Sequence, residues 1–469
     1  MEFSGRIVMI GCGSIGQAIL PLLHRHLTLG PGQIIVLSAD EAGRRIAQEN
    51  RANFIHAHLK PRSFRRILGE HLRPGDLLLN LSVDVSSLDL VKYASENGVL
   101  YVDTSIEPWP GVFDNPMLDL RQRTNFMIRE RALQLSRELG SDAPTAVVDH
   151  GANPGLVSHF VKKAMLDLKT ALGNPRSTPT CPEEWALLSK ELGIDLIQIS
   201  ERDTQASDRP KRPGEFVNTW SVDGLIDEAM QPSEISFGTA EKRRPKAAQF
   251  HRRGSGTMFL NRPGAATFAR SWTPSSGGFQ GVLMTHDEVF SIADLLSLRD
   301  GADFTYRPTV MYVYHPCDDA MLSMLELEGS GWQPQVQKRR LGPDIVTGMD
   351  ELGVLLAGHA RNAYWYGSQL TIEEARRHVP YANATSIQVV AGALTGIMWA
   401  IHNPRRGLVE PDDMDFEFCL EVATPYLGRM VGEFTDWTPL QGRGELFDEM
   451  LDVDQPWQLE NARARQWRG

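Results

Sequence analysis

Acidic, aromatic and histidine side chains occur in this chain at positions where core packing alone would not place them. They are Glu201, Trp220, Glu228, His286 and Glu288. Each one alone has an ordinary explanation, as a surface carboxylate, a core aromatic or a capping residue. Together they suggest a pocket for a cation, because carboxylates pair with ammonium groups and the face of a tryptophan ring attracts positive charge.

The elements that must position these side chains are short apolar strands and one helix. Glu201 directly follows the predicted strand 196–200, and His286 follows the strand 281–284. Glu228 comes eight residues after Trp220, on a predicted helix. Three further polar residues lie at predicted strand ends or in the hinge that follows them, namely Asp84, Glu107 and Asn153.

The N-terminal region contains a glycine motif typical of dinucleotide binding. An apolar strand, residues 6–10, runs into Gly11, Gly13 and Gly16, and a predicted amphipathic helix follows. In such a motif the first glycine allows the tight turn, the second lets the backbone approach a pyrophosphate, and the third lets helix and strand pack closely. The alternative is a purely structural glycine turn, but the strand before and the helix after favour nucleotide binding.

Strands and helices alternate through the first 150 residues. The predicted strands cover residues 6–10, 33–37, from 54, 76–82, 99–103 and 146–148. This alternation predicts an α/β fold with a Rossmann-type, doubly wound parallel sheet, in which ligands bind beyond the carboxyl ends of the strands. The residues expected to contact the cofactor are Gly11, Gly13, Ser14, Ile15, Gly16, Asp40, Ser82, Val83, Thr104, Asn153 and Pro154.

The residues at the end of the second predicted strand leave open whether the cofactor is NAD or NADP. An acidic residue is typical at this point, but Ser38 occupies it and Asp40 follows two positions later. Asp40 is able to bind the ribose hydroxyls and so favours NAD. Alternatively, Ser38 with Arg44 and Arg45 would accept a 2′-phosphate. We expect NAD.

Length and composition describe an ordinary acidic globular protein. The chain has 469 residues, 42% hydrophobic residues and a formal net charge of −11. We expect no nucleic-acid partner and no membrane span, and the apolar run 389–401 is predicted to be a buried helix. Four widely spaced cysteines form no CxxC pair, which argues against a structural metal site and favours a reducing, cytoplasmic environment.

Three segments are expected. Residues 1–150 would bind the nucleotide, and residues 151–380, where strand-like segments alternate with irregular connections, would form an α+β domain for substrate binding and dimerisation. Residues 381–469 are predicted to be helix and loop packing on the other two.

In its candidate site residues and glycine motif, the chain resembles the bacterial homospermidine synthases, NAD-dependent relatives of the saccharopine dehydrogenase group. The matching stretches occur in order and span nearly the whole chain. They are IVMIGCGSIG, NLSVDVSSLD, EPW, GANPG, ERDTQ, VNTWSV, SWTP, THDE, YHPCDDA, NAYWYGSQL, TPYLG and TDWTPL. The departures from the family pattern are Cys12 in the first turn and Ser38 at the end of the second strand.

The resemblance implies a reaction in which two putrescines form sym-homospermidine and release ammonia. NAD+ takes a hydride from the carbon beside one amine, a second putrescine displaces ammonia from the resulting imine, and the hydride then returns. The resemblance also implies a homodimer, and spermidine as an alternative to one putrescine.

The resemblance assigns roles to the site residues. Trp220 would be the cation–π platform, and Glu201 and Glu228 would anchor amine groups, one of them accepting a proton. Asn153 would orient the amine and the nicotinamide. His286 and Glu288 would move protons, while Asp84 and Glu107 would form an acidic entrance.

Two other classes of function remain open at this point. A saccharopine or carboxyspermidine dehydrogenase would bind a carboxylate-bearing substrate and would need an arginine facing the nicotinamide, for which Arg202 and Arg270 are the candidates. A non-catalytic NAD-binding module would tolerate the loss of Glu201, Trp220 and Glu228.

Overall fold

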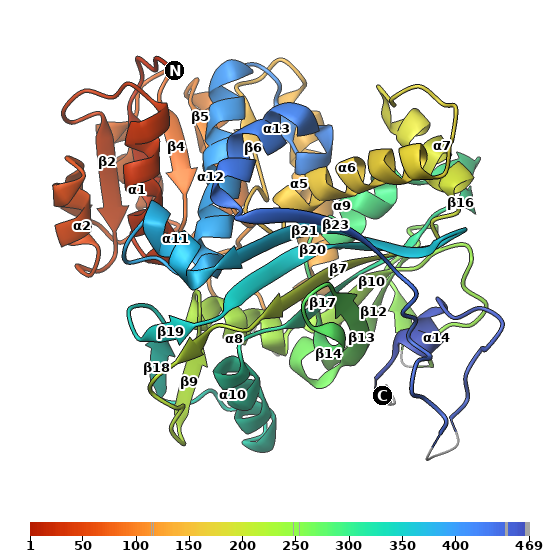
Figure 1. Cartoon of the computed structure of the whole chain (residues 1–469). Coiled ribbons are helices and arrows are strands. Elements are labelled where there is room, and N and C mark those ends of the chain that lie inside the picture. The colour runs from red at the N-terminus through yellow and green to blue at the C-terminus, as the bar shows by residue number, and fades with distance from the viewer. Residues whose placement is uncertain (114, 116, 247, 253, 446–448, 465–469) are drawn as a thin grey trace. The chain divides into compact units, whose positions relative to one another are not determined.

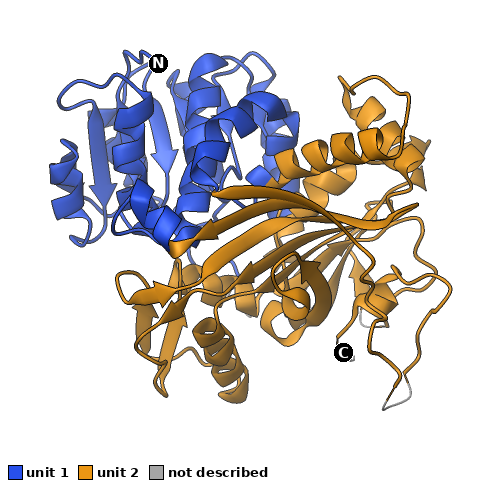
Figure 2. Ribbon diagram, in the orientation of Figure 1, with its two compact units in different colours: residues 1–116, 127–156, 373–427 blue, residues 117–126, 157–372, 428–469 orange. Residues whose placement is uncertain are grey.

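The computed structural model describes residues 1–113, 115, 117–246, 248–252, 254–445 and 449–464. The chain divides into two compact units, which Figure 2 colours separately. Unit 1 consists of residues 1–116, 127–156 and 373–427, and unit 2 of residues 117–126, 157–372 and 428–469. The predicted boundary at residue 150 lies close to a boundary between the units, whereas the predicted C-terminal segment 381–469 is divided between them.

Unit 1 is built on a parallel sheet, as predicted. In the described part of the unit the sheet has seven strands, in the order β22-β6-β5-β4-β1-β2-β3. They are β1 (Ile7–Ile10), β2 (Ile34–Ser38), β3 (Asn53–His56), β4 (Leu77–Asn80), β5 (Leu100–Asp103), β6 (Ala146–Val147) and β22 (Leu408–Val409). The chain winds outward from β1 to β2 and β3 on one side and through β4, β5 and β6 on the other, so the strand order reverses beside β1.

Helices connect the strands of unit 1. They are α1 (Ser14–His26), α2 (Arg44–Glu49), α3 (Phe64–His71), α4 (Ser87–Glu96), α5 (Asn125–Leu139), α11 (Ile372–His378), α12 (Ala384–His402) and α13 (Phe416–Ala423), with short 3₁₀ turns at Pro411–Asp413 and Thr424–Tyr426. The 19-residue α12 is long and apolar enough to cross a membrane, with a mean hydropathy of 1.5, but 89% of that window is buried. It packs against α1, α13 and β5, so it is a core helix of unit 1, as the sequence predicted.

Unit 2 contains a larger, mostly antiparallel sheet. Its described residues form ten strands, with the path β11-β12-β10-β17-β7-β20-β21-β23 and with β13 and β14 joined to it at β17. They are β7 (Leu196–Asp203), β10 (Pro232–Ser236), β11 (Ala248–Phe250), β12 (Thr257–Pro263), β13 (Phe268–Thr273), β14 (Gly277–Met284), β17 (Thr309–His315), β20 (Met349–His359), β21 (Asn362–Thr371) and β23 (Arg429–Thr435). Only β7 and β17 pair in parallel among these described strands. The sheet is the α+β core that the sequence predicted for this region.

Smaller elements complete unit 2. The helices are α6 (Leu156–Ala171), α7 (Pro182–Leu192), α8 (Val222–Met230), α9 (Glu288–Leu295), α10 (Asp318–Gly329) and α14 (Leu459–Ala462), with 3₁₀ turns at Leu120–Arg123 and Gly264–Ala266. Three two-stranded pairs join β15 (Leu298–Asp300) to β16 (Asp303–Tyr306), β18 (Gln337–Arg340) to β9 (Glu215–Asn218), and β19 (Ile345–Thr347) to β8 (Ala206–Ser207).

Two expectations about strands were wrong. The strand predicted to end at residue 200 continues through Glu201 to Asp203, so Glu201 lies within β7. The segment predicted to be helix and loop contains β23, which pairs along β21 (Figure 1). Both errors have the same cause. Polar residues interrupt the apolar pattern from which strands are predicted, but pairing with neighbouring strands satisfies the hydrogen-bonding groups of the backbone, so the strand continues.

Candidate active site

The glycine turn after β1 leaves its backbone open to a ligand. Gly11 has φ +89°, and a Cβ there would lie 2.7 Å from the carbonyl oxygen of Leu81, so only glycine fits. A Cβ at Gly16 would lie 2.7 Å from the carbonyl oxygen of Gly11, which makes this the close helix–strand contact. At Gly13, by contrast, a Cβ would meet nothing within 4 Å. The turn therefore leaves space for a pyrophosphate where the motif requires it.

The N-terminus of α1 points out of this turn. Ser14 and Ile15 form the first turn of the helix, and its N-cap, Gly13, makes no side-chain hydrogen bond to the helix backbone. The first N–H groups of a helix have no partner within the helix, and they carry its partial positive charge. A phosphate group is the ligand that such an end binds best.

The residues beyond β2 favour a ribose without a 2′-phosphate. Ser38 ends β2 and is buried, while Asp40 is exposed and accepts a hydrogen bond from the Ala42 N–H at 2.8 Å. Arg44 is paired with Glu41 and stacks on Phe54, with its guanidinium carbon 4.5 Å from the ring centre. Arg45 is paired with Glu49 at 2.5 Å, so each arginine already has a carboxylate partner.

Cys12, one of the two departures from the family pattern, is inert in this turn. Its side chain is buried, and Gly43 packs directly against it. Burial, together with the charge of nearby Asp40, raises the pKa of the Cys12 thiol to about 11. The thiol therefore stays neutral beside the ribose end of the site and contributes packing rather than chemistry.

The remaining predicted cofactor residues follow the next strands of the same sheet. Ser82 and Val83 come after β4, where Asn80 Oδ1 accepts hydrogen bonds from the Ser82 hydroxyl at 2.6 Å and from its N–H at 3.3 Å. Thr104 follows β5 and is partly buried. Because carboxyl ends of parallel strands share one edge of a sheet, these residues line the same edge as Gly11.

The loop after β6 carries Asn153 and Pro154 and is anchored by α12. A Cβ at Gly392 of α12 would lie 2.0 Å from the carbonyl oxygen of Gly151, so glycine allows helix and loop to touch. His150 Nδ1 lies 2.9 Å from the carbonyl oxygen of Gly392. Burial lowers the pKa of His150 to about 4, so its ring is neutral. This packing holds the loop at the carboxyl edge of the sheet.

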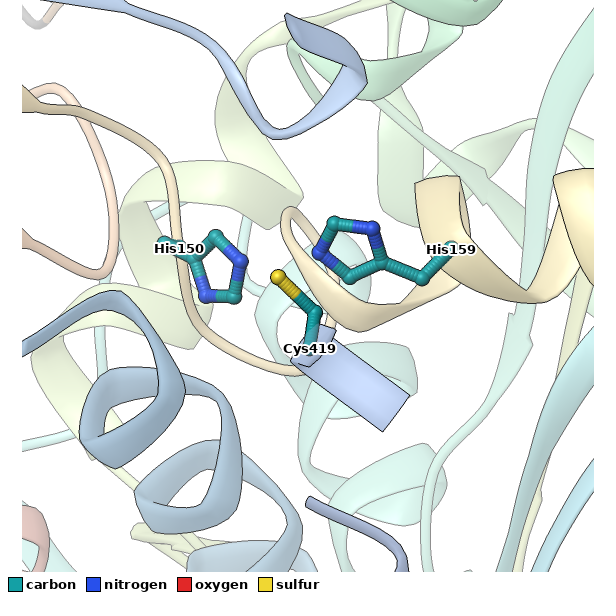
Figure 3. Close-up of side chains that lie close together, drawn as sticks. All are labelled: His150, His159 and Cys419. Carbon is teal, nitrogen blue, oxygen red and sulfur yellow. The ribbon is translucent and has the colours of Figure 1, made fainter. Parts of the chain in front are cut away.

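A side chain from α13 lies near the start of the same loop. The Cys419 sulfur lies within 4.8 Å of a ring nitrogen of His150, and Figure 3 shows the two side chains facing one another. Both side chains are buried. His159, also drawn there, comes from α6 of unit 2.

The two residues predicted to form an acidic entrance also lie at strand ends of unit 1. Asp84 is exposed and adopts φ +65° in the turn after β4. Glu107 is partly buried after β5, where its N–H donates to the Ser87 hydroxyl at 3.0 Å and its carbonyl oxygen accepts from the Ser87 N–H at 2.8 Å. These bonds fix the backbone of Glu107 against the start of α4.

In unit 2, Glu201 is a buried carboxylate on β7. Its side chain is only 3% exposed, and the Tyr312 hydroxyl donates a hydrogen bond of 2.5 Å to its Oε2. Burial and the charge of Glu201 raise the pKa of Tyr312 well above its ordinary value, so the hydroxyl remains a donor. Tyr314, two residues further along β17, lies directly opposite Glu201 in the parallel register of the two strands.

His286 lies between two carboxylates. Its Nε2 is 3.4 Å from Glu228 Oε2, on α8, and its Nδ1 is 3.2 Å from Glu288 Oε1, at the start of α9. Burial opposes protonation of the ring, but the charges and hydrogen bonds of Glu288 and Glu228 prevail and raise the pKa of His286 well above its usual value. The group is therefore an imidazolium held by two carboxylates at neutral pH. Its ring also packs against that of Tyr312 in a tilted arrangement, with the ring centres 4.5 Å apart.

Trp220 joins this group through Tyr314. The Trp220 indole Nε1 donates to the Tyr314 hydroxyl at 3.4 Å, and the rings of Tyr312 and Tyr314 stack 5.7 Å apart. The Trp220 side chain is half-buried, and a Cβ at Gly224 would lie 2.8 Å from its Cζ3, so the indole rests on the first turn of α8.

We call this group the acidic–aromatic cluster; it consists of Glu201, Trp220, Glu228, His286, Glu288, Tyr312 and Tyr314. Unit 2 thus brings together five of the six residues predicted to be catalytic, and the sixth, Asn153, belongs to unit 1. The sequence analysis missed the two tyrosines that connect the others. Their i, i+2 spacing on β17, which places both on one face, was the available signal.

The two arginines that a carboxylate-binding enzyme would need are engaged elsewhere in unit 2. Arg202 Nη1 donates to the Pro316 carbonyl at 3.3 Å, and its Nη2 is 3.1 Å from Asp318 Oδ1. Arg270 donates to the carbonyl oxygens of Pro439 at 2.6 Å and Gln441 at 2.9 Å. Both guanidinium groups are thus held by partners outside the acidic–aromatic cluster.

Comparison with known proteins identifies both parts of the chain. Residues 7–147 match the saccharopine dehydrogenase NADP binding domain, and residues 151–436 match the saccharopine dehydrogenase C-terminal domain. The homospermidine synthase of Blastochloris viridis is 47% identical over 99% of this chain and 98% of its own length. That of Mesorhizobium japonicum is 44% identical over 99% of this chain and 97% of its own length.

A solved structure agrees with these relatives. The homospermidine synthase of Legionella pneumophila, crystallised in complex with NAD, is 42% identical, with a TM-score of 0.93 over 99% of both chains. The chain therefore belongs to the homospermidine synthase family, and it carries both saccharopine dehydrogenase domains.

Proposed function

We propose that this chain is an NAD-dependent homospermidine synthase that converts two putrescines into sym-homospermidine and ammonia. One amine nitrogen leaves as ammonia, the other three are retained, and there is no net oxidation. The relatives named above are homospermidine synthases, and they match nearly all of this chain. We further propose that spermidine replaces one putrescine as an alternative substrate, and that the enzyme is a cytoplasmic homodimer.

The residues of unit 1 fit NAD. The open space at Gly13 and the uncapped start of α1 suit its pyrophosphate, and Asp40 suits the adenosine ribose. Ser82, Val83, Thr104, Asn153 and Pro154 would hold the nicotinamide half along the same edge. When bound, NAD supplies a hydride acceptor whose reduced form returns the hydride within one cycle.

Within the acidic–aromatic cluster, Glu201 is our candidate for amine binding and proton acceptance. An alkylammonium group must lose a proton before its neighbouring carbon can give up a hydride, and a buried carboxylate is a suitable base. The Tyr312 hydroxyl holds Glu201 in place at 2.5 Å. The indole of Trp220 would stabilise the cationic imine that follows, since the face of tryptophan attracts positive charge.

The remaining side chains would bind and neutralise the other amines. Glu228 and Glu288 hold His286 as an imidazolium, which can give a proton to the amino group that leaves as ammonia when its C–N bond breaks. Asn153 would orient the reacting amine, and Asp84 with Glu107 would attract the dicationic substrate at an entrance.

The observation that carries this proposal is the charge of the acidic–aromatic cluster. Of the three carboxyl groups there, Glu228 and Glu288 pair with His286 and Glu201 accepts from Tyr312, while Glu288 Oε2 is buried without a hydrogen-bond partner among the residues that the structure describes. A buried, unpaired carboxylate oxygen is costly unless a ligand completes it. A diamine brings two cationic ends and no carboxylate of its own, and so fits this cluster.

The stoichiometry of turnover tests the function. Purified protein with excess putrescine and catalytic NAD+ is expected to release ammonia and homospermidine in a one-to-one ratio, without accumulating NADH, because the hydride returns within each cycle. Chromatography of the amines, an ammonia assay and absorbance at the NADH band measure the three quantities. Stoichiometric NADH, or a requirement for a 2-oxo acid, would instead indicate a dehydrogenase, and no amine turnover at all would indicate a binding module.

Cofactor preference is expected to follow Asp40. NAD+ should bind at least about tenfold more tightly than NADP+, because a 2′-phosphate would meet the Asp40 carboxylate, while Arg44 and Arg45 are already paired. Calorimetry on the wild type and on Asp40→Asn measures the affinities for both cofactors. In the variant, the affinities for NAD+ and NADP+ should differ less than in the wild type. Equal binding of both cofactors by the wild type would show that the arginines, not Asp40, govern this end.

A further inference from the structure

Glu234 is a buried carboxyl group that the catalytic proposal does not use. It lies on β10, is fully buried, and has partners for both of its oxygens within unit 2. Oε2 accepts hydrogen bonds from the Thr285 hydroxyl at 2.6 Å and from the N–H of Asn125, at the start of α5, at 2.8 Å. Oε1 lies 3.0 Å from His251 Nε2. Because a buried carboxyl group is costly unless its oxygens are satisfied, these three contacts hold one another in a fixed arrangement.

The His251 side of this carboxyl group is rigid. The His251 ring is buried and stacks on that of Phe126, with the ring centres 4.3 Å apart, and it packs against Phe259 at 4.9 Å. Phe126 in turn packs edge to face on Phe290 of α9, at 5.5 Å. This close packing restricts rotation of the His251 ring. Glu234 is therefore anchored on this side and offers a fixed acceptor to Thr285 on the other.

Thr285 joins this anchor to the acidic–aromatic cluster. It follows Met284, the last residue of β14, and directly precedes His286. The chain enters α9 at Glu288, so only three residues separate the strand from the helix. Thr285 is fully buried. Holding its hydroxyl therefore restrains the short stretch of backbone from which the His286 ring projects.

Two side-chain contacts tie the same pair of chain segments together. One segment runs from Glu228 on α8 to Glu234 on β10, and the other runs from Thr285 to the start of α9. Glu228 Oε2 lies 3.4 Å from His286 Nε2, whereas Glu234 accepts from Thr285 at 2.6 Å. The side chain of Glu228 is 23% exposed, but Glu234 and Thr285 are fully buried. The shorter, water-excluded bond is the stronger one, and it sets the spacing that the longer contact spans.

We propose that Glu234 and Thr285 are positioning residues, whose hydrogen bond holds the His286 ring between Glu228 and Glu288. This proposal rests on the proton-transfer role that the proposed function gives to His286. Without the bond, the backbone before His286 would be less restrained, and the ring would spend less time between its two carboxylates. Proton transfer requires the donor within hydrogen-bonding distance of the acceptor, so the reaction would slow.

Thr285→Val tests the bond, because it removes the hydroxyl and keeps the size of the side chain. We expect kcat for putrescine to fall about tenfold with little change in KM, since a displaced proton donor affects the reaction more than substrate binding. Thr285→Ser keeps the hydroxyl and should retain most of the wild-type kcat. Thr309→Val is the matched control: Thr309 is also buried and donates to a carboxylate, Glu241, but at the end of β17 away from the two tyrosines. It should turn over as the wild type does.

The pH profile separates positioning from a loss of stability. Burial opposes protonation of His286, but Glu288 and Glu228 outweigh it and raise its pKa, and Tyr312 is the other titratable group that packs against the ring. A ring that leaves these carboxylates has a lower pKa. As pH rises, Thr285→Val should therefore lose kcat at lower pH than the wild type does. Side-chain NMR titration of His286, assigned with His286→Gln, should show the same direction without requiring turnover.

These measurements give opposite results for the two explanations. An unchanged alkaline limb and an unchanged His286 titration in Thr285→Val, or a kcat that falls only in step with the melting temperature, would make the bond purely structural and overturn the proposal. Thr285→Ala removes the same hydroxyl without placing a methyl group beside Glu234, and it repeats the test if the valine variant folds poorly. If the wild type makes no homospermidine, the proposed function fails, whereas the NMR titration still decides whether the bond positions His286.

Discussion

Replacing Glu201 with glutamine is expected to lower kcat/KM for putrescine by about two orders of magnitude. The carboxylate is 3% exposed and accepts the Tyr312 hydroxyl at 2.5 Å, so its charge faces little water. Removing one partner of a buried charged interaction costs about 2–5 kcal/mol, and each 1.4 kcal/mol is tenfold. Steady-state kinetics measure the loss, and NAD+ affinity, measured by calorimetry, should remain unchanged.

Glu351→Gln is the matched control for this substitution. Glu351 lies on the neighbouring strand β20, is 1% exposed, and accepts hydrogen bonds from the Ser275 N–H at 3.1 Å and the Gln369 amide at 2.6 Å. It is outside the acidic–aromatic cluster, so its variant should keep most of the activity. A Glu201→Gln enzyme that is fully active, or whose loss follows only a lower melting temperature, would contradict the role assigned to Glu201.

The nucleotide-binding half of the fold was predictable because its signals are local. A buried strand, a glycine turn and an amphipathic helix follow one another within residues 7–26, and the structure has β1 and α1 there. The parallel sheet follows from the alternation of strand and helix. Its seventh strand, β22, was not predictable, because two residues 261 positions beyond β6 give no local pattern of their own.

The large sheet of unit 2 was only partly predictable. The long strand β21 carries Asn362, Gln369 and several aromatic side chains, and this mixture is not the simple alternation of a half-buried strand. Its pairing with β20 and β23 provides the hydrogen bonds that make it a strand. Such pairing depends on tertiary structure, which overrides local propensity.

The candidate site, too, was predictable from the sequence only in part. Carboxylates, Trp220 and His286 were recognised because polar groups beside apolar strands are unusual. Tyr312 and Tyr314 were missed because, on a buried strand, tyrosines resemble ordinary core residues. Only the structure shows that their hydroxyls contact Glu201 and Trp220, through which they connect separate elements of unit 2.

Trp220 provides the sharpest test of how the acidic–aromatic cluster stabilises a cation. The ordinary alternative is that its indole only packs on the first turn of α8, at Gly224, and holds Tyr314. Phenylalanine keeps an aromatic ring and most of that packing, but its face attracts a cation less strongly, and it also loses the long hydrogen bond to the Tyr314 hydroxyl. Alanine removes both the packing and the π surface.

We therefore expect Trp220→Phe to slow turnover about tenfold with little change in melting temperature, because weaker stabilisation of the cationic intermediate costs ~1–2 kcal/mol. Trp220→Ala should slow turnover more than Trp220→Phe does. Trp185→Phe is the control: this buried indole on α7 lies 5.9 Å from the Lys162 ammonium, outside the acidic–aromatic cluster, and its variant should remain active. Turnover and thermal melts of all three variants separate the explanations. If Trp220→Phe is fully active, or if activity falls only in step with stability, Trp220 is a packing residue and the cation must be stabilised by the carboxylates alone.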